Sequence, residues 1–257
     1  MRGIFTSLAI TLGLLAPATQ ALASGIVYLG SDPTAHYTSF PQGLTLVQNA
    51  VTFAGGQSNP TMLLVGSGTG FGNTPSMLTA AGLSYNQIAP INLASTILGS
   101  YQVVYFAPTT ASAEVAFYTA AAAQVLSYTN GGGGLVVEPE VFATGSWGWV
   151  PYANLIGHSG ATNVTVETVV LINNPPLSNS LTSFGLSNWG SSNHSTFSTP
   201  GAAGFTTLST VNNGIAQVIF RANANAAVPE PATLAVFGGI ALAGAFGYRR
   251  RKATASV

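Results

Sequence analysis

Short apolar runs recur along the middle of the chain and alternate with stretches whose apolar spacing is helical. Most of the runs are continuous rather than alternating, which is typical of parallel strands covered on both faces of a sheet. Strands and helices in alternation indicate a three-layer α/β domain with a mainly parallel sheet. Residues 178–209, rich in Ser, Asn, Gly and Thr, are expected to be irregular or to form a short hairpin. The pattern predicts strands at residues 25–30, 61–66, 101–107, 134–138, 164–172 and 216–221, and helices at residues 43–53, 74–81, 93–98 and 113–128.

Residues 1–23 have the pattern of a signal peptide. Arg2 is the charged start, residues 4–15 form the apolar segment, and the small residues Ala21 and Ala23 close it. Signal peptidase is therefore expected to cut after Ala23, so that the mature chain begins at Ser24.

An uncharged apolar segment, residues 232–248, stands near the C-terminus, directly before the basic run Arg249 to Lys252. As a helix, these 17 residues would cover roughly 25 Å, close to the apolar thickness of a bilayer. The basic run would stay on the cytoplasmic side, which places the bulk of the chain outside the cytoplasm. The alternative is a buried core helix with a basic end.

A Pro-Glu-Pro tripeptide precedes the apolar segment and three arginines follow it: Pro229, Glu230, Pro231, Arg249, Arg250 and Arg251. This order resembles the PEP-CTERM sorting signal of exported bacterial proteins, here over residues 229–252. The resemblance implies that an exosortase, a membrane-embedded cysteine transpeptidase, recognises the chain and cuts it near the tripeptide. It also implies a Gram-negative host that makes exopolysaccharide, transient anchoring through the helix 232–248, and delivery to the cell envelope or extracellular matrix.

Removal of both ends leaves a domain at residues 24–224 and a short linker at residues 225–228. Between residues 24 and 228 the chain has one basic residue, Arg221, and five acidic ones, a formal charge of −4. A single cation cannot neutralise several phosphates, so nucleic acid is not expected as a partner. Because the sequence has no cysteine, the domain depends on its core rather than on disulfides and has no cysteine nucleophile.

A further resemblance rests on the order of the segments MLLVGSGTG, LTAAGLSYNQI, YQVVYFAP and GGGGLVVEPE. The order is similar to that of the class I glutamine amidotransferase-like superfamily, including its ThuA-like branch, and implies a flavodoxin-like domain. In the amidotransferases the strand after such a glycine run ends in a nucleophile elbow with a cysteine. Here the matching positions hold Glu138, Pro139 and Glu140, and Pro139 has no N–H to stabilise an oxyanion. The resemblance therefore supports the fold and argues against the activity.

Glu138 and Glu140 follow a predicted strand, at the edge where open α/β sheets hold ligands. Paired carboxylates serve acid/base chemistry or bind a hard cation such as Ca²⁺, but without further matched ligands two exposed loop carboxylates are the favoured interpretation. His194 lies late in the chain, where amidotransferase-like domains keep a catalytic histidine, but its neighbours do not match that motif. His36, His158 and His194 have no metal-ligand spacing, so neither a metal nor a cofactor is expected.

Trp147 and Trp149 form an aromatic cluster with Tyr152. Such rings either stack on sugars, as candidate ligand contacts, or pack a loop onto its own core. The glycine-rich segment 66–72 is either an anion cradle or a plain turn.

These patterns predict an exported envelope or matrix protein, associated with exopolysaccharide, whose domain is not a working enzyme. Two alternatives stay open. The first is a hydrolase or metal-dependent enzyme built on Glu138, Glu140 and His194, and the second is a carbohydrate-binding module that uses Trp147 and Trp149.

Overall fold

The computed structural model of the chain describes residues 24–68, 72–139, 147–160, 168–187, 189, 195–211 and 214–223. These residues belong to one compact unit, Leu22–Ala227. No helix in these ranges combines the length and the apolar character needed to cross a membrane. Outside them lie the predicted signal peptide at residues 1–23, the linker at 225–228, the sorting signal at 229–252 with its helix 232–248, Glu140 and His194.

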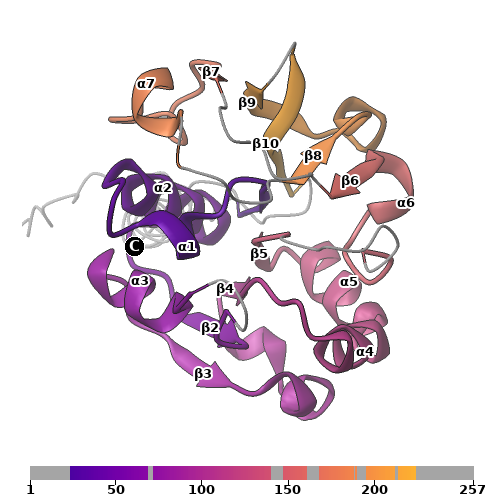
Figure 1. Cartoon of the computed structure of the whole chain (residues 1–257). Coiled ribbons are helices and arrows are strands. Elements are labelled where there is room, and N and C mark those ends of the chain that lie inside the picture. The colour runs from indigo at the N-terminus through magenta and orange to yellow at the C-terminus, as the bar shows by residue number, and fades with distance from the viewer. Residues whose placement is uncertain are drawn as a thin grey trace, which may run out of the picture. The chain divides into compact units, whose positions relative to one another are not determined.

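The strands of the described ranges join in one sheet (Figure 1). Its main order is β3-β2-β4-β5-β1-β10-β8-β6, with β9 paired to β10 and β7 paired to β9. The strands are β1 (Gly25–Leu29), β2 (Met62–Val65), β3 (Asn86–Ile88), β4 (Val103–Phe106), β5 (Gly134–Val137), β6 (His158–Gly160), β7 (Val169–Leu171), β8 (Ser195–Phe197), β9 (Thr206–Val211) and β10 (Ile215–Ala222).

The sheet is mixed, with a parallel half and an antiparallel half that meet between β1 and β10. Strands β3, β2, β4, β5 and β1 run parallel, in this order. The pairings of β10 with β1, β8 and β9, of β6 with β8, and of β7 with β9 are antiparallel. The mainly parallel sheet predicted from the sequence is thus corrected to a mixed one. The prediction missed β8, which lies in the polar stretch 178–209, and β9, which begins in it, because Ser and Thr hide the apolar pattern there.

The helices alternate with the parallel strands and continue into the second half of the domain (Figure 1). The helix predicted at residues 113–128 is two helices, because Ala121 has a ψ of 2° and interrupts the first. The α-helix predicted at residues 93–98 is wrong: residues 93–95 end a 3-10 helix, Pro90–Ser95, residues 96 and 97 are extended, and Leu98 begins a second 3-10 helix, Leu98–Ser100. A third 3-10 helix spans Pro200–Ala203. The α-helices are α1 (Pro33–His36), α2 (Gln42–Gly55), α3 (Thr74–Ala80), α4 (Ser112–Ala120), α5 (Ala122–Asn130), α6 (Ala153–Ile156) and α7 (Ser183–Leu186).

Two apolar cores cover the two faces of the sheet, because successive side chains of a strand point to opposite faces. Val27 and Leu29 of β1 belong to the core that contains the buried residues of α2 and α3. Ile26 and Tyr28 of the same strand belong to the other core, with buried residues of α4, α5 and α6. All four side chains are fully buried. The continuous apolar runs in the sequence therefore mark strands that are covered on both faces.

Gly30 joins the two halves of the sheet just after β1. Its N–H donates to the carbonyl of Gln217 at 2.9 Å, and its carbonyl accepts from the N–H of Ser195 at 2.8 Å. A Cβ at this position would overlap the carbonyl oxygens of both Gln217 and Ser195. These contacts are made by backbone atoms, which cannot turn aside as a side chain can. The junction between the two halves of the sheet, called the seam below, thus requires a residue without a side chain at position 30.

We predict that Gly30→Ala lowers the free energy of unfolding by about 2–3 kcal/mol, the usual cost of overpacking a tight site. Gly99→Ala is the matched control, because a Cβ there meets no atom within 4 Å, and it should change stability by less than about 0.5 kcal/mol. Urea unfolding of residues 24–228 measures both. Equal stability of the two variants would show that the seam tolerates a side chain.

Candidate functional site

The side chain of Glu138 lies at the carboxyl end of β5, where parallel α/β sheets hold their ligands. Its backbone continues the pairing with β4, since the N–H of Glu138 donates to the carbonyl of Phe106 at 3.2 Å. The residue is only 3 % exposed. The favoured interpretation of an exposed loop carboxylate is therefore wrong for Glu138, while Glu140 lies outside the described residues.

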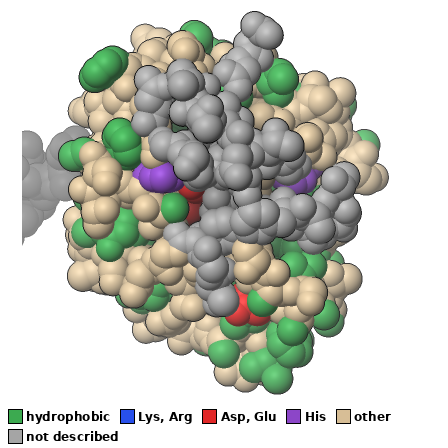
Figure 2. Space-filling view, in the orientation of Figure 1, with side chains coloured by type: hydrophobic (Ala, Val, Ile, Leu, Met, Phe, Trp, Pro, Cys, Tyr) green, Lys and Arg blue, Asp and Glu red, His purple; other side chains and the backbone are tan. Residues whose placement is uncertain are grey.

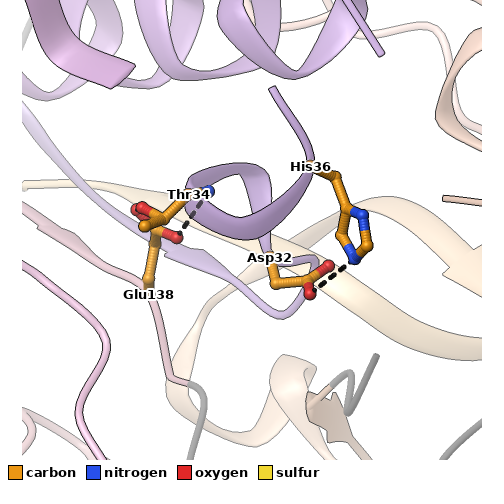
Figure 3. A network of polar contacts seen from close by, with 4 residues as sticks. All are labelled: Asp32, Thr34, His36 and Glu138. Carbon is orange, nitrogen blue, oxygen red and sulfur yellow. Dashed lines mark hydrogen bonds and ion pairs between the residues drawn. The ribbon is translucent and has the colours of Figure 1, made fainter. Parts of the chain in front are cut away.

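Hydrogen bonds from two other segments satisfy the Glu138 carboxyl group. The Thr34 hydroxyl donates to Oε1 at 2.7 Å, and the Thr34 N–H donates to Oε2 at 3.3 Å. The Tyr105 hydroxyl of β4 donates to Oε1 as well. Figure 3 shows Thr34 and Glu138 side by side. The carboxyl group therefore links the end of β5 to α1 and to β4.

The sequence around α1 explains why Glu138 is needed there. The first N–H groups of a helix have no partner within the helix and need an outside acceptor. Asp32 occupies the N-cap position, but its side chain makes no capping hydrogen bond. Its Oδ2 instead lies 3.0 Å from Nε2 of His36, one turn further on (Figure 3). Glu138 supplies the acceptor that the N-cap residue does not.

The hydroxyl of Thr34 extends the network to α3. Its oxygen lies 3.1 Å from that of Thr74, the first residue of α3. Because the single hydroxyl proton of Thr34 goes to the carboxyl group of Glu138, the Thr74 hydroxyl donates to Thr34. Near the glycine-rich segment 66–72, the N–H of Thr74 also donates to the carbonyl of Ser67 at 3.1 Å. Residues 69–71 of that segment lie outside the described ranges, so its role as an anion cradle or a plain turn stays a prediction.

Burial raises the pKa of Glu138 to about 7, while the hydrogen bonds from Tyr105 and Thr34 act in the opposite direction and the charge of Asp32 raises it further. Desolvation dominates because a carboxylate loses more hydration free energy on burial than the neutral acid does. A neutral-range pKa is a property of general acids and bases. It also follows from burial alone, so access to the carboxyl group decides between the two roles.

Access to Glu138 is narrow. The cavity beside it has a volume of about 20 Å³ and is also lined by Thr109, Tyr118 and Trp147. This volume holds about one water molecule. Tyr118 Oη and Trp147 Nε1 are buried without a hydrogen-bond partner in the part of the chain that the structure describes, so they are suitable partners for that water. Among the described residues, this cavity has no room for a substrate.

A second polar pair, missed by the sequence analysis, lies where β6 meets β8. His158 Nε2 is 3.0 Å from the hydroxyl oxygen of Ser195, and that hydroxyl donates to the carbonyl of Pro139. Burial lowers the pKa of His158 to about 4, and its hydrogen bond with the Pro139 backbone opposes this shift. The serine gives its proton to the backbone rather than to the imidazole, the reverse of what activates a nucleophile. No spacing signal in the sequence connects the two residues, which are 37 positions apart.

The aromatic cluster packs on the core. Trp147 and Trp149 are 4 % and 7 % exposed. The ring of Trp149 lies 4.7 Å from that of Phe106 and 4.8 Å from that of Tyr118, and the ring of Trp147 lies 4.2 Å from that of His158. Both tryptophans also line a larger pocket of about 490 Å³. Their role as ligand contacts stays a prediction.

The described residues contain no group of three or more His, Asp or Glu side chains arranged to hold a metal ion. Figure 2 shows mainly hydrophobic and uncharged polar side chains on one face of these ranges, with a few acidic and histidine side chains. His36 belongs to the contact with Asp32, and His158 to the contact with Ser195. His36 is thus connected to Glu138 only indirectly, through Asp32 and Thr34 of the network in Figure 3, whereas His158 belongs to a different contact.

Glu138 and His158 are predicted to change stability in opposite directions with pH. Between about pH 4.5 and 7 the folded Glu138 keeps a proton that the unfolded chain has lost, so stability falls as pH rises. Between about pH 4 and 6.5 the unfolded chain protonates His158 and the folded one does not, so stability falls as pH falls. The two effects oppose each other in the shared range.

Single substitutions separate these effects in urea unfolding measured from pH 4 to 8. We expect the free energy of unfolding of Glu138→Gln to rise with pH up to about 6.5, because the His158 effect alone remains. His158→Gln should show the reverse, with a fall up to about pH 7. Parallel pH profiles for the wild type and both variants would contradict the assigned shifts.

The comparisons with known proteins identify the C-terminal region. No curated protein and no solved structure matches the chain. Residues 227–252 match the family model of the PEP-CTERM protein-sorting motif, which confirms the resemblance seen in the sequence. The motif implies export, processing by an exosortase, and sorting to the cell envelope or the extracellular space. The chain therefore carries a PEP-CTERM protein-sorting motif at residues 227–252, which supports an extracellular protein sorted by an exosortase.

Proposed function

We propose that the exported domain is a non-catalytic component of the cell envelope or extracellular matrix and is associated with exopolysaccharide. Signal peptidase removes residues 1–23 after Ala23, and the apolar helix 232–248 holds the chain in the inner membrane until the exosortase acts. The arginines behind that helix remain in the cytoplasm. In this proposal the host is a Gram-negative bacterium that makes exopolysaccharide.

The enclosure of Glu138 is the observation that supports a non-catalytic role. The carboxyl group is 3 % exposed and accepts hydrogen bonds from Thr34 and Tyr105. A general acid or base must reach the proton that it transfers, directly or through one water. Among the described residues, the adjoining cavity of about 20 Å³ leaves no room for a substrate. The position is thus better suited to anchoring α1 than to catalysis.

The strand order supports a flavodoxin-like origin of the parallel half. Flavodoxin-like sheets have the order 2-1-3-4-5. Here the order in chain numbering is 3-2-4-5-1, so the strands follow the flavodoxin-like order when they are counted from β2, and β1 takes the place of the last strand. We propose that the domain is related to the amidotransferase-like proteins in this half. On that proposal, the strand end that carries their nucleophile holds Glu138, which has a structural role.

The test is complementation of a deletion strain of the native host by the wild type, Glu138→Gln and Glu230→Ala. We expect Glu138→Gln to restore the amount of exopolysaccharide retained by the cells, because Gln keeps an acceptor for Thr34. Glu230→Ala should accumulate unprocessed in the inner membrane and restore nothing, because the sorting tripeptide is broken. Immunoblots of the membrane and extracellular fractions report sorting.

Two results would refute the proposal. A Glu138→Gln protein that is exported at the wild-type level and restores nothing would indicate catalysis. Normal maturation of Glu230→Ala would show that sorting does not depend on the Pro-Glu-Pro tripeptide.

A further inference from the structure

The pocket of about 490 Å³ lies between α5 and the segment that leads from Trp147 into α6. It is lined by Ala122, Ala123 and Leu126 of α5, by residues 147–154, and by His158 of β6. Its volume is within the range of small-molecule sites in proteins, about 300–1,000 Å³. The short side chains of Ala122 and Ala123 leave this space open. The pocket is distinct from the small cavity at Glu138, although Trp147 and Trp149 line both.

The loop wall of the pocket is held in place by contacts outside the pocket. The hydroxyl of Tyr28, on β1, donates to the carbonyl of Pro151 at 2.7 Å. The hydroxyl of Tyr152 donates to the side-chain oxygen of Asn130 at the end of α5, at 3.2 Å. The guanidinium of Arg221 lies 4.2 Å from the centre of the Tyr152 ring. The aromatic wall is thus preformed, which lowers the entropic cost of binding.

The lining of the pocket carries no charge at neutral pH. None of its described residues is Asp, Glu, Lys or Arg. His158 is neutral because burial lowers its pKa to about 4. Arg221, the one basic residue between residues 24 and 228, already lies over the ring of Tyr152. An anionic ligand such as a uronic acid would find no counter-charge there.

The polar groups at the pocket are uncharged hydrogen-bonding groups. Asn154 presents an exposed amide, and His158 presents an imidazole that is only partly buried. The backbone is open at Gly148, where a Cβ would meet no atom within 4 Å. An aromatic and aliphatic wall together with a few neutral donors and acceptors suits a ligand with C–H faces and hydroxyl groups. A purely apolar ligand would leave these polar groups unpaired.

We propose that this pocket binds an uncharged saccharide unit of the extracellular polysaccharide, so that it is the contact between the domain and the matrix. The inference rests on the proposed function, because export places the domain where polysaccharide is present. The apolar wall, in which Tyr152 is the partly exposed aromatic side chain, packs against the C–H face of the sugar, and Asn154 and His158 bind its hydroxyl groups. Neutral saccharides are preferred over uronic acids because no cation lines the pocket.

Gly148→Phe tests the proposal by filling the pocket. The position is exposed and open, and its backbone is not left-handed, so the new side chain has space without a clash in the described residues. Gly99→Phe is the matched control, since a Cβ there also meets nothing within 4 Å and the residue does not line the pocket. Asn154→Ala is a second variant that removes a hydrogen-bonding group and adds no bulk.

The full-length chains are expressed in the native host, and the processed proteins are purified from the extracellular fraction. The probes are the neutral and the uronic-acid-containing oligosaccharides of the host exopolysaccharide, separated by anion exchange, and the uncharged apolar dye N-phenylnaphthylamine. Titration calorimetry should show binding of the neutral fraction to the wild type and Gly99→Phe. Gly148→Phe should bind it about tenfold or more weakly, and Asn154→Ala should also bind it more weakly. Equal thermal unfolding of the two Phe variants checks that both are folded.

Three results overturn the inference: no binding of the neutral fraction, preference for the charged fraction, or binding of the dye alone. Equal binding by the wild type, Gly148→Phe and Asn154→Ala would also overturn it and place the contact elsewhere. None of these outcomes affects sorting or the role of Glu138, which the complementation experiment tests separately. A negative binding result for the pocket can therefore be told apart from a negative complementation result for the proposed function.

Discussion

The buried carboxyl group of Glu138 connects three segments that are far apart in the sequence. It ends β5, accepts hydrogen bonds from Thr34 in α1, and accepts one from Tyr105 in β4. Burying a carboxyl group is costly unless its oxygens are hydrogen-bonded. These segments must therefore keep their relative positions for the carboxyl group to remain buried. Through Thr34 and Thr74 the same network also reaches α3.

β1 connects the segments around Glu138 to the rest of the domain. It pairs with β5 in the parallel half and with β10 in the antiparallel half, and Gly30 at its end bonds to both Gln217 and Ser195. α1 and its Thr34 follow directly from the same strand. On the opposite face, Tyr28 of β1 holds the carbonyl of Pro151 and so fixes the loop that lines the aromatic pocket. One strand thus positions both the closed carboxyl site and the open pocket.

The sequence predicts those strands and motifs that are marked by residues adjacent to one another in the chain. The continuous apolar runs at β1, β2, β4 and β5 were found because both faces of these strands are covered. β3 was missed because its residues, Asn86 to Ile88, are polar or partly exposed at the edge of the described sheet. The sorting motif was readable because its parts are adjacent in sequence.

The site was less predictable because its partners are distant in sequence. The position of Glu138 at a strand end followed from the apolar run before it. Its donors did not, since Thr34 is 104 positions away and Tyr105 is 33 positions away. The same holds for His158 and Ser195, whose contact depends on the antiparallel pairing of β6 and β8. The burial of Trp147 and Trp149 likewise depends on Tyr28, Phe106 and Tyr118, which the spacing of the tryptophans does not reveal.

The central claim is that Glu138 is an enclosed anchor for α1, and a ¹³C NMR titration of its side-chain carboxyl carbon in the folded protein tests this most directly. The account predicts an apparent pKa of about 7 for this group. It also predicts that the amide resonance of Thr34 shifts with the same midpoint, because that N–H donates to the carboxyl group. A carboxyl pKa near 4.5 with a Thr34 amide that does not respond would contradict the account, since it would show a solvated carboxylate at an open sheet edge.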